Sequence, residues 1–145
     1  MQKLLKYLAI FLLLATTNIF SQLSRTHYIP PLTHAGTGNA NANDQYLYIS
    51  TPSITEVPVI ISPVGGNQIE TTVSNANPRV INLNSGYGQL FVQASTTSQV
   101  HNDKGFIIEA EDVIYVSVRM IAGDGDQAGA LTTKGINGLG NIFRI

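Results

Sequence analysis

The chain has 145 residues, of which 12% are charged, and its formal net charge is −1. A typical soluble protein has about 25% charged residues, so most of this surface must be neutral and polar. This composition excludes the basic surface of a nucleic-acid-binding protein, and we expect no nucleic-acid partner. The absence of cysteine excludes a disulfide-stapled module and a thiol nucleophile.

Residues 1–21 have the three-part layout of a secretory signal peptide. Lys3 and Lys6 provide the positive start, residues 8–15 are apolar, and cleavage is expected after Ser21. The apolar run is shorter than the ~20 residues that a membrane-spanning helix needs. The sequence therefore predicts a helical signal peptide, export to the cell surface or the medium, and no transmembrane segment after its removal. One domain is expected over residues 22–145.

The rest of the chain predicts short strands separated by turns. Residues 33–44 contain no apolar side chain larger than alanine and predict a loop. Pro58 lacks a backbone donor, which predicts that its strand lies at a sheet edge or contains a bulge. Alternating apolar residues predict strands over residues 23–32, 45–50, 56–62, 68–74, 79–84 and 89–94. Within the fourth of these, Ile69, Thr71 and Val73 are expected to face inward.

The strongest strand pattern lies at residues 105–119. Phe106 and Ile108 fall on one side of an extended chain, and Ile114 and Val116 do the same after a polar break. We predict an antiparallel pair that turns at residues 110–112 and forms the centre of the core.

The spacing of these strands predicts an all-β fold, an antiparallel β-sandwich of Greek-key type. Residues 141–145 read as the start of a further strand. We therefore expect a fragment whose sandwich is incomplete at its C-terminal end. Residues 22–145 alone should be marginally stable or aggregate, and a sharp cooperative melt of a monomer would contradict this.

The sequence contains no complete pattern of metal ligands. His27, His34 and His101 lack any paired spacing, and ordinary surface histidines are expected. Asp124 and Asp126 resemble the start of a calcium loop, but the glutamate that should follow is missing, so a soluble glycine turn is the simpler interpretation. We predict no metal and no cofactor, and cation binding at these two aspartates stays open.

Catalysis has no supporting motif. Glu109, Glu111 and Asp112 could form a carboxylate pair for glycoside hydrolysis, but three acids at a predicted turn are usually solvated. No nucleophile elbow is present, and the glycines at 38 and at 138–140 lack a phosphate-loop lysine. We predict a protein that is not an enzyme and assign no catalytic residue.

Four aromatic residues are candidates for an outer face. Tyr46, Tyr48, Tyr87 and Phe91 could stack on sugars or pack on a neighbouring domain. Cross-strand packing within the sheet is the commoner role of such residues. We assign no ligand-binding residue at this point.

Several segments together resemble the N-terminal region of large exported proteins of gliding Bacteroidetes. They are THYIPPLT (26–33), QYLYISTP (45–52), NDKGF (102–106), VSVR (116–119), QAG (127–129) and KG (134–135). Those proteins carry a module similar to the N-terminal domain of IgGFc-binding protein. They typically end in a type B sorting domain, the gliding-motility-associated C-terminal domain, which directs them through type IX secretion. The resemblance covers only the beginning of that region, without the sorting domain, and supplies no catalytic or binding residues.

The expected function is a non-enzymatic surface or secreted module for adhesion, or for protein or glycan contact, within a larger protein. Its partners would be a surface protein or glycan and downstream domains of the same longer chain. One alternative is a carbohydrate-binding accessory domain of a secreted polysaccharide-degrading enzyme. Another is a structural spacer.

Overall fold

The computed structural model describes residues 22–33, 42–122 and 128–138. Within these ranges the regular structure consists of strands and two short 3-10 helices. In chain order they are β1 (Ser24–Ile29), β2 (Ala42–Ser50), β3 (Val57–Pro63), β4 (Ile69–Val73), β5 (Arg79–Asn82), η1 (Ala94–Thr96), β6 (Phe106–Ala122), β7 (Ala128–Thr132) and η2 (Gly135–Gly138). All pairings between these strands are antiparallel. The predicted all-β fold class is confirmed.

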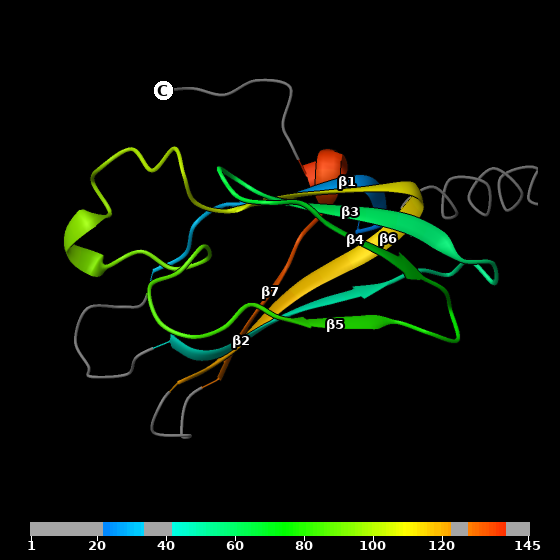
Figure 1. Cartoon of the computed structure of the whole chain (residues 1–145), viewed down its shortest axis with the longest axis horizontal. Helices are drawn as coiled ribbons and strands as arrows, with labels where there is room; N and C mark the ends of the chain where they lie inside the picture. Colours follow the sequence, from blue (N-terminus) through cyan, green and yellow to red (C-terminus); the bar gives the residue numbers. More distant parts are fainter. Residues whose placement is uncertain (1–21, 34–41, 123–127, 139–145) are drawn as a thin grey trace, which may run out of the picture.

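Strand β6 connects two groups of strands. Its first part, residues 106–110, pairs with β3, and most of this part also pairs with β1, while residues 115–122 pair with β2 and residues 117–121 with β7. Figure 1 shows β1, β3 and β4 on one side of the molecule and β2, β5 and β7 on the other, with β6 running between them. The resulting order is β4-β3-β6-β2-β5 within one sheet. The Greek-key sandwich stays a prediction.

The predicted hairpin at residues 110–112 is wrong, because β6 is one strand of 17 residues. A tight hairpin turn needs positive φ, and neither Glu111 nor Asp112 adopts it. The polar break is instead a bulge: Thr26 pairs with Glu109, whereas Ser24 pairs with Ile114. Extra residues on one strand bend it. The bend directs the second half of β6 towards the other group of strands.

The core lies between the two groups of strands and includes residues from the loop before η1. Because the side chains of a strand alternate, every second residue is buried along residues 45–49 of β2 and 57–61 of β3. In β6, residues 106, 108, 114, 116 and 118 are buried, and Ser117 is buried as well. The cluster comprises Ile29, Leu47, Ile49, Val57, Val59, Ile61, Val73, Leu90, Phe91, Phe106, Ile108, Ile114, Val116 and Val118. The alternating apolar residues on which the strands at 45–50 and 56–62 are predicted all lie in this cluster.

Pro58 predicted an edge strand or a bulge, and both alternatives are wrong. Strand β3 lies between β4 and β6, and its pairing with each runs without a register shift. Pro58 pairs with Thr72 of β4, and the ladder to β6 begins one residue later, at Val59. Pro58 has no backbone N–H, and it lies at a position where the ladder to β6 needs no hydrogen bond from it. Strands β3 and β4 form an antiparallel hairpin, as the glycines between the two predicted strands favour, with Gly65 at φ 77°.

Residues 89–94 do not form the predicted strand. Leu90, Phe91 and Val92 are all buried instead of alternating. They make one parallel bridge, in which the Leu32 amide donates to Leu90 O (2.7 Å) and the Val92 amide donates to Leu32 O (2.9 Å). Pro30 and Pro31 lack the amide protons that would extend this ladder, so it stops there.

Two further predictions fail in detail, and one strand was not predicted. Ile69, expected inward, is 40% exposed because it lies at the start of the edge strand β4. Asn43 and Asp44, expected in a loop, belong to β2, where they form a bulge with Asp44 at φ 40°. Strand β7 was not predicted, because its residues (AGALT) are small and give no alternating pattern.

Several predictions concern segments outside the described residues. These are the helical signal peptide, most of the loop at 33–44, the aspartates at 124 and 126, and the strand start at 141–145.

Candidate functional site

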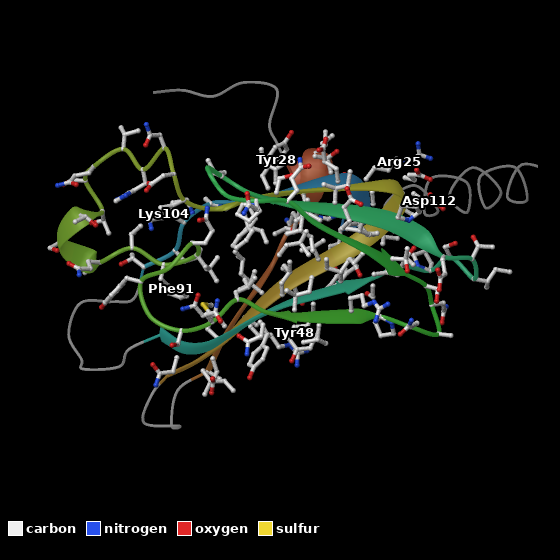
Figure 2. All side chains as sticks on the ribbon, in the orientation of Figure 1. Arg25, Tyr28, Tyr48, Phe91, Lys104 and Asp112 are labelled. Atoms are coloured by element: carbon white, nitrogen blue, oxygen red, sulfur yellow. The ribbon has the colours of Figure 1, made fainter. Side chains whose placement is uncertain are left out.

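The outer side of β2 carries two tyrosines. Leu47 and Ile49 are fully buried, so the alternating residues Tyr46 and Tyr48 project from the opposite side of the strand and remain half-buried. Their ring centroids are 6.4 Å apart with an interplanar angle of 63°, an edge-to-face arrangement. Figure 2 shows Tyr48 on the opposite side of the molecule from Tyr28.

Strand β6 completes this surface. Tyr46 pairs with Arg119, and Tyr48 pairs with Ser117, so these side chains share one side of the sheet. Tyr115 precedes Ser117 by two residues and lies on the same side, where its hydroxyl is 3.0 Å from the Thr132 hydroxyl of β7. We call Tyr46, Tyr48, Tyr115 and Arg119 the tyrosine face. Ser117, which lies between Tyr115 and Arg119 in β6, is buried.

Arg119 is held against Tyr48. Its guanidinium carbon lies 4.8 Å from the centroid of the Tyr48 ring, within the range of a cation–π contact. Arg119 is exposed, and within the described part of the chain its guanidinium has neither an ion pair nor a hydrogen bond. By contrast, Arg25 pairs with Asp112 at 3.9 Å and Arg79 donates to Thr72 O at 3.0 Å. Among the described residues, none occupies the donors of this guanidinium, which is positioned by the Tyr48 ring.

The structure brings together only two of the four predicted aromatic candidates. Tyr46 and Tyr48 are adjacent, whereas Tyr87 lies in the turn after β5 and is 41% exposed. Phe91, a candidate for an outer face, is 4% exposed and packs in the core, which is the commoner role expected for these aromatic residues. The two-residue spacing of Tyr115, Ser117 and Arg119 places them on one side of their strand, but the sequence did not single out Tyr115 or Arg119 as candidates.

The prediction that His27 is a surface histidine is wrong. His27 is fully buried between β1 and β6. Its Nδ1 atom lies 2.6 Å from the Thr133 hydroxyl, and its Nε2 atom lies 3.0 Å from Ile114 O and 3.2 Å from Ser24 O. These partners fit a neutral imidazole with Nε2–H donating to a carbonyl and Nδ1 accepting from Thr133. Burial lowers the pKa of His27, and the bonds to the Ile114 and Ser24 carbonyls oppose that shift in part.

The other histidines do not converge with His27. His101 is half-buried near η1, with Nε2 2.8 Å from Thr96 O, and His34 lies outside the described residues. Within the described ranges, no three His, Asp or Glu side chains are grouped as a metal site requires.

The three candidate carboxylates lie on and beside the bulge of β6, not at a turn. Glu109 and Glu111 are exposed and line a depression of about 300 Å³ with Pro58, Ile60 and Ala110. The Asp112 carboxylate accepts a hydrogen bond from the Val113 amide at 2.7 Å, so this backbone donor at the bulge has a partner. Asp112 thus has a structural role.

No protein-family model matches the chain, and searches of curated proteins and of solved structures find no significant match. Among the residues that the structure describes, no helix has the length and apolar character needed to cross a membrane.

Proposed function

We propose that this chain is a non-enzymatic, exported module that makes adhesive contacts with a protein or glycan at the cell surface. The observation that carries the proposal is the tyrosine face. Tyrosine and arginine are enriched in protein contact sites, and aromatic rings also stack on sugars. The Tyr46 and Tyr48 rings and the Arg119 guanidinium are held together by contacts among themselves, so little ordering is needed when a partner binds.

Export and membership of a larger protein are part of the proposal. The layout of residues 1–21 supports export. The resemblance to large type IX-secreted proteins of gliding Bacteroidetes supports a role as one module in a longer surface protein. The low content of charged residues and the lack of cysteine are compatible with a bacterial exterior.

Cell fractionation tests the location and size. An antibody raised against residues 22–145 is used on cell-surface, periplasmic and medium fractions. A surface band much larger than 145 residues would support the proposal. A band of this length in the cytoplasm would contradict both export and membership of a larger protein.

A tyrosine variant tests the contact site. Tyr46→Ala with Tyr48→Ala should abolish binding of the full chain to the producing cells or to a glycan array. Tyr28→Ala is the matched control, because Tyr28 is 45% exposed on the other side of the molecule. Equal binding by the double variant and the control, with both folded by circular dichroism, would overturn the assignment of the tyrosine face.

The second candidate is a carbohydrate-binding accessory domain of a secreted polysaccharide-degrading enzyme. The paired tyrosines favour it as well. In the first proposal the module belongs to a surface protein, and in the second it belongs to an enzyme that cleaves polysaccharides. Polysaccharide cleavage by the immunoprecipitated native protein would favour the accessory domain, whereas adhesion without cleavage would favour the surface module.

A further inference from the structure

We infer that the outer edge of β4 pairs with β4 of a second copy of this chain, antiparallel and about a two-fold axis at Thr71. In this register Glu70 of each copy lies opposite Thr72 of the other. The inference goes beyond the proposed function and uses no residue of the tyrosine face, because β4 belongs to the other group of strands (Figure 1).

The outer edge of β4 is open, since no described strand pairs with it. The Val64 amide, directly after β3, donates to Gly105 O at 3.1 Å, so even-numbered residues of β3 direct their backbone groups to β6 and odd-numbered ones to β4. Thr71, which pairs with an odd-numbered residue, therefore bonds to β3, whereas Glu70 and Thr72 direct their amides and carbonyls outward. Outward groups of this kind are a template for a further strand.

The other outer strands are less suited to pairing with a second copy. The edge of β1 is covered by η2, where the Ile136 amide donates to Ser24 Oγ at 3.4 Å. Strand β5 has four residues and follows Pro78, and both features blunt an edge. Strand β7 has the uncharged sequence AGALT, so charge cannot fix its register against a second copy.

Charge selects one register for β4. Two identical strands related by a two-fold axis make every contact twice. An axis at Glu70 would place two carboxylates directly opposite each other, which is destabilising. An axis at Thr72 would bring two Arg79 side chains together, because each Arg79 is bonded to Thr72 O. An axis at Thr71 avoids both contacts and places Glu70 opposite Thr72.

Arg79 fits this register. Its Nε atom donates to Thr72 O at 3.0 Å, and no carboxylate of the described residues lies within ion-pair distance of its guanidinium. Thr72 O keeps a second lone pair for an amide of the second copy, and Arg79 keeps its terminal donors. Arg79, Glu70 and Thr72 border one depression, so the guanidinium lies near the side of β4 that carries Glu70. Glu70 of the second copy, opposite Thr72, therefore comes beside these donors.

The core-facing side of β4 also gains contacts. Ile69 is 40% exposed, although it lies on the same side of the strand as buried Val73. With the axis at Thr71, Ile69 lies opposite Val73 of the second copy, and the two Thr71 side chains are neighbours. Aliphatic and threonine pairs of this kind stabilise antiparallel strands. The pairing thus covers an apolar side chain that one copy leaves exposed.

Sedimentation of the full chain measures the association. Five paired residues in each copy form less than a standard interface, so we expect a reversible dimer that dissociates on dilution, with a Kd between about 10 μM and 1 mM. Glu70→Arg and Arg79→Glu should each raise this Kd about tenfold or more, because each brings like charges together. The variant with both changes restores opposite charges and should dimerise again. Glu109→Arg is the matched control on β6 and should leave the dimer unchanged.

Cysteine cross-linking tests the register. The chain has no cysteine, so one introduced cysteine can form only an intermolecular disulfide. Thr71→Cys puts both thiols at the axis, in a pair of positions with closely spaced Cβ atoms, and should give a linked dimer on mild oxidation. Thr72→Cys is the matched control, because its two Cα atoms would be about 8 Å apart, beyond the ~7 Å limit for a disulfide. It should cross-link far more slowly.

A monomer at every concentration up to about 1 mM would overturn the inference. Equal cross-linking of Thr71→Cys and Thr72→Cys, or a dimer that neither charge reversal weakens, would assign the contact to another surface and overturn it too. Open-ended oligomers would exclude the closed two-fold pairing. Circular dichroism checks the fold of each variant, and recovery in the double charge reversal separates the ion pair from misfolding. None of these outcomes changes the test of the tyrosine face.

Discussion

The Nδ1 atom of His27 and the Oγ1 atom of Thr133 lie 2.6 Å apart, although 106 positions separate the two residues in the chain. Through its other ring nitrogen, His27 also contacts the carbonyl of Ile114 in β6. One buried imidazole thus connects β1, β6 and the segment that follows β7.

The stability of the protein should fall as the pH drops below 6.5. Burial lowers the pKa of folded His27 from its ordinary value of 6.5, so below that pH the unfolded chain binds more protons than the folded chain. The free energy of unfolding therefore decreases as the pH falls from 6.5 through the lowered pKa. Protonation of buried His27 costs free energy mainly because the charged ring is not hydrated. It also ends the bond from Thr133, but the Thr133 hydroxyl can then donate to Val116 O, 3.3 Å away.

Urea denaturation at about pH 7.5 and about pH 5 measures this effect. His27→Gln retains hydrogen-bonding groups but cannot titrate in this range, so its stability should depend less on pH. The same pH dependence in the wild type and His27→Gln would contradict the assignment to His27.

Removing the hydroxyl of Thr133 should destabilise the fold more than removing the hydroxyl of Thr132. Thr133→Val leaves a buried ring nitrogen without its partner, which should lower the free energy of unfolding by about 1–3 kcal/mol. Thr132→Val removes the half-buried hydroxyl near Tyr115 and should cost about 0.5–1 kcal/mol. Chemical denaturation of both variants gives the comparison, and equal losses would contradict the importance of the His27 contact.

Gly135 should tolerate no side chain. It has φ 58°, and an added Cβ would lie 2.7 Å from Thr26 O and against the side chain of Ser24. Gly135→Ala should therefore cost about 2 kcal/mol or more, through backbone strain and the clash. Gly86 is the control, since it has φ 76° but open space around its Cβ position, and Gly86→Ala should cost only about 1 kcal/mol. Equal melting temperatures for the two variants would show that η2 does not pack tightly on β1.

Asp112 should stabilise the bulge of β6 mainly through the Val113 amide. Asp112→Ala removes both this bond and the ion pair with Arg25, and should cost about 1 kcal/mol. Arg25→Ala removes only the exposed pair at 3.9 Å and should cost less than about 0.5 kcal/mol. A larger loss for Arg25→Ala than for Asp112→Ala in thermal denaturation would assign the stabilisation to the ion pair instead.

In β2 and β3 the local pattern of the sequence determined that the chain is extended and which side of it is buried. Leu47 and Ile49 in β2, and Val57, Val59 and Ile61 in β3, alternate because successive side chains of a strand point to opposite sides. This signal needs only neighbours in the sequence. The hairpin between β3 and β4 was also predictable, because Gly65 can adopt positive φ.

Tertiary structure alone decided how those strands are joined and which polar residues meet. Whether residues 110–112 turn or bulge depends on the partners of β6, since β1 and β3 pair with one half and β2 and β7 with the other. The burial of His27 depends on Thr133 and Ile114, and the position of Arg119 depends on the register between β2 and β6. Cross-strand register is a relation between segments distant in sequence, and a period of two within one segment does not contain it.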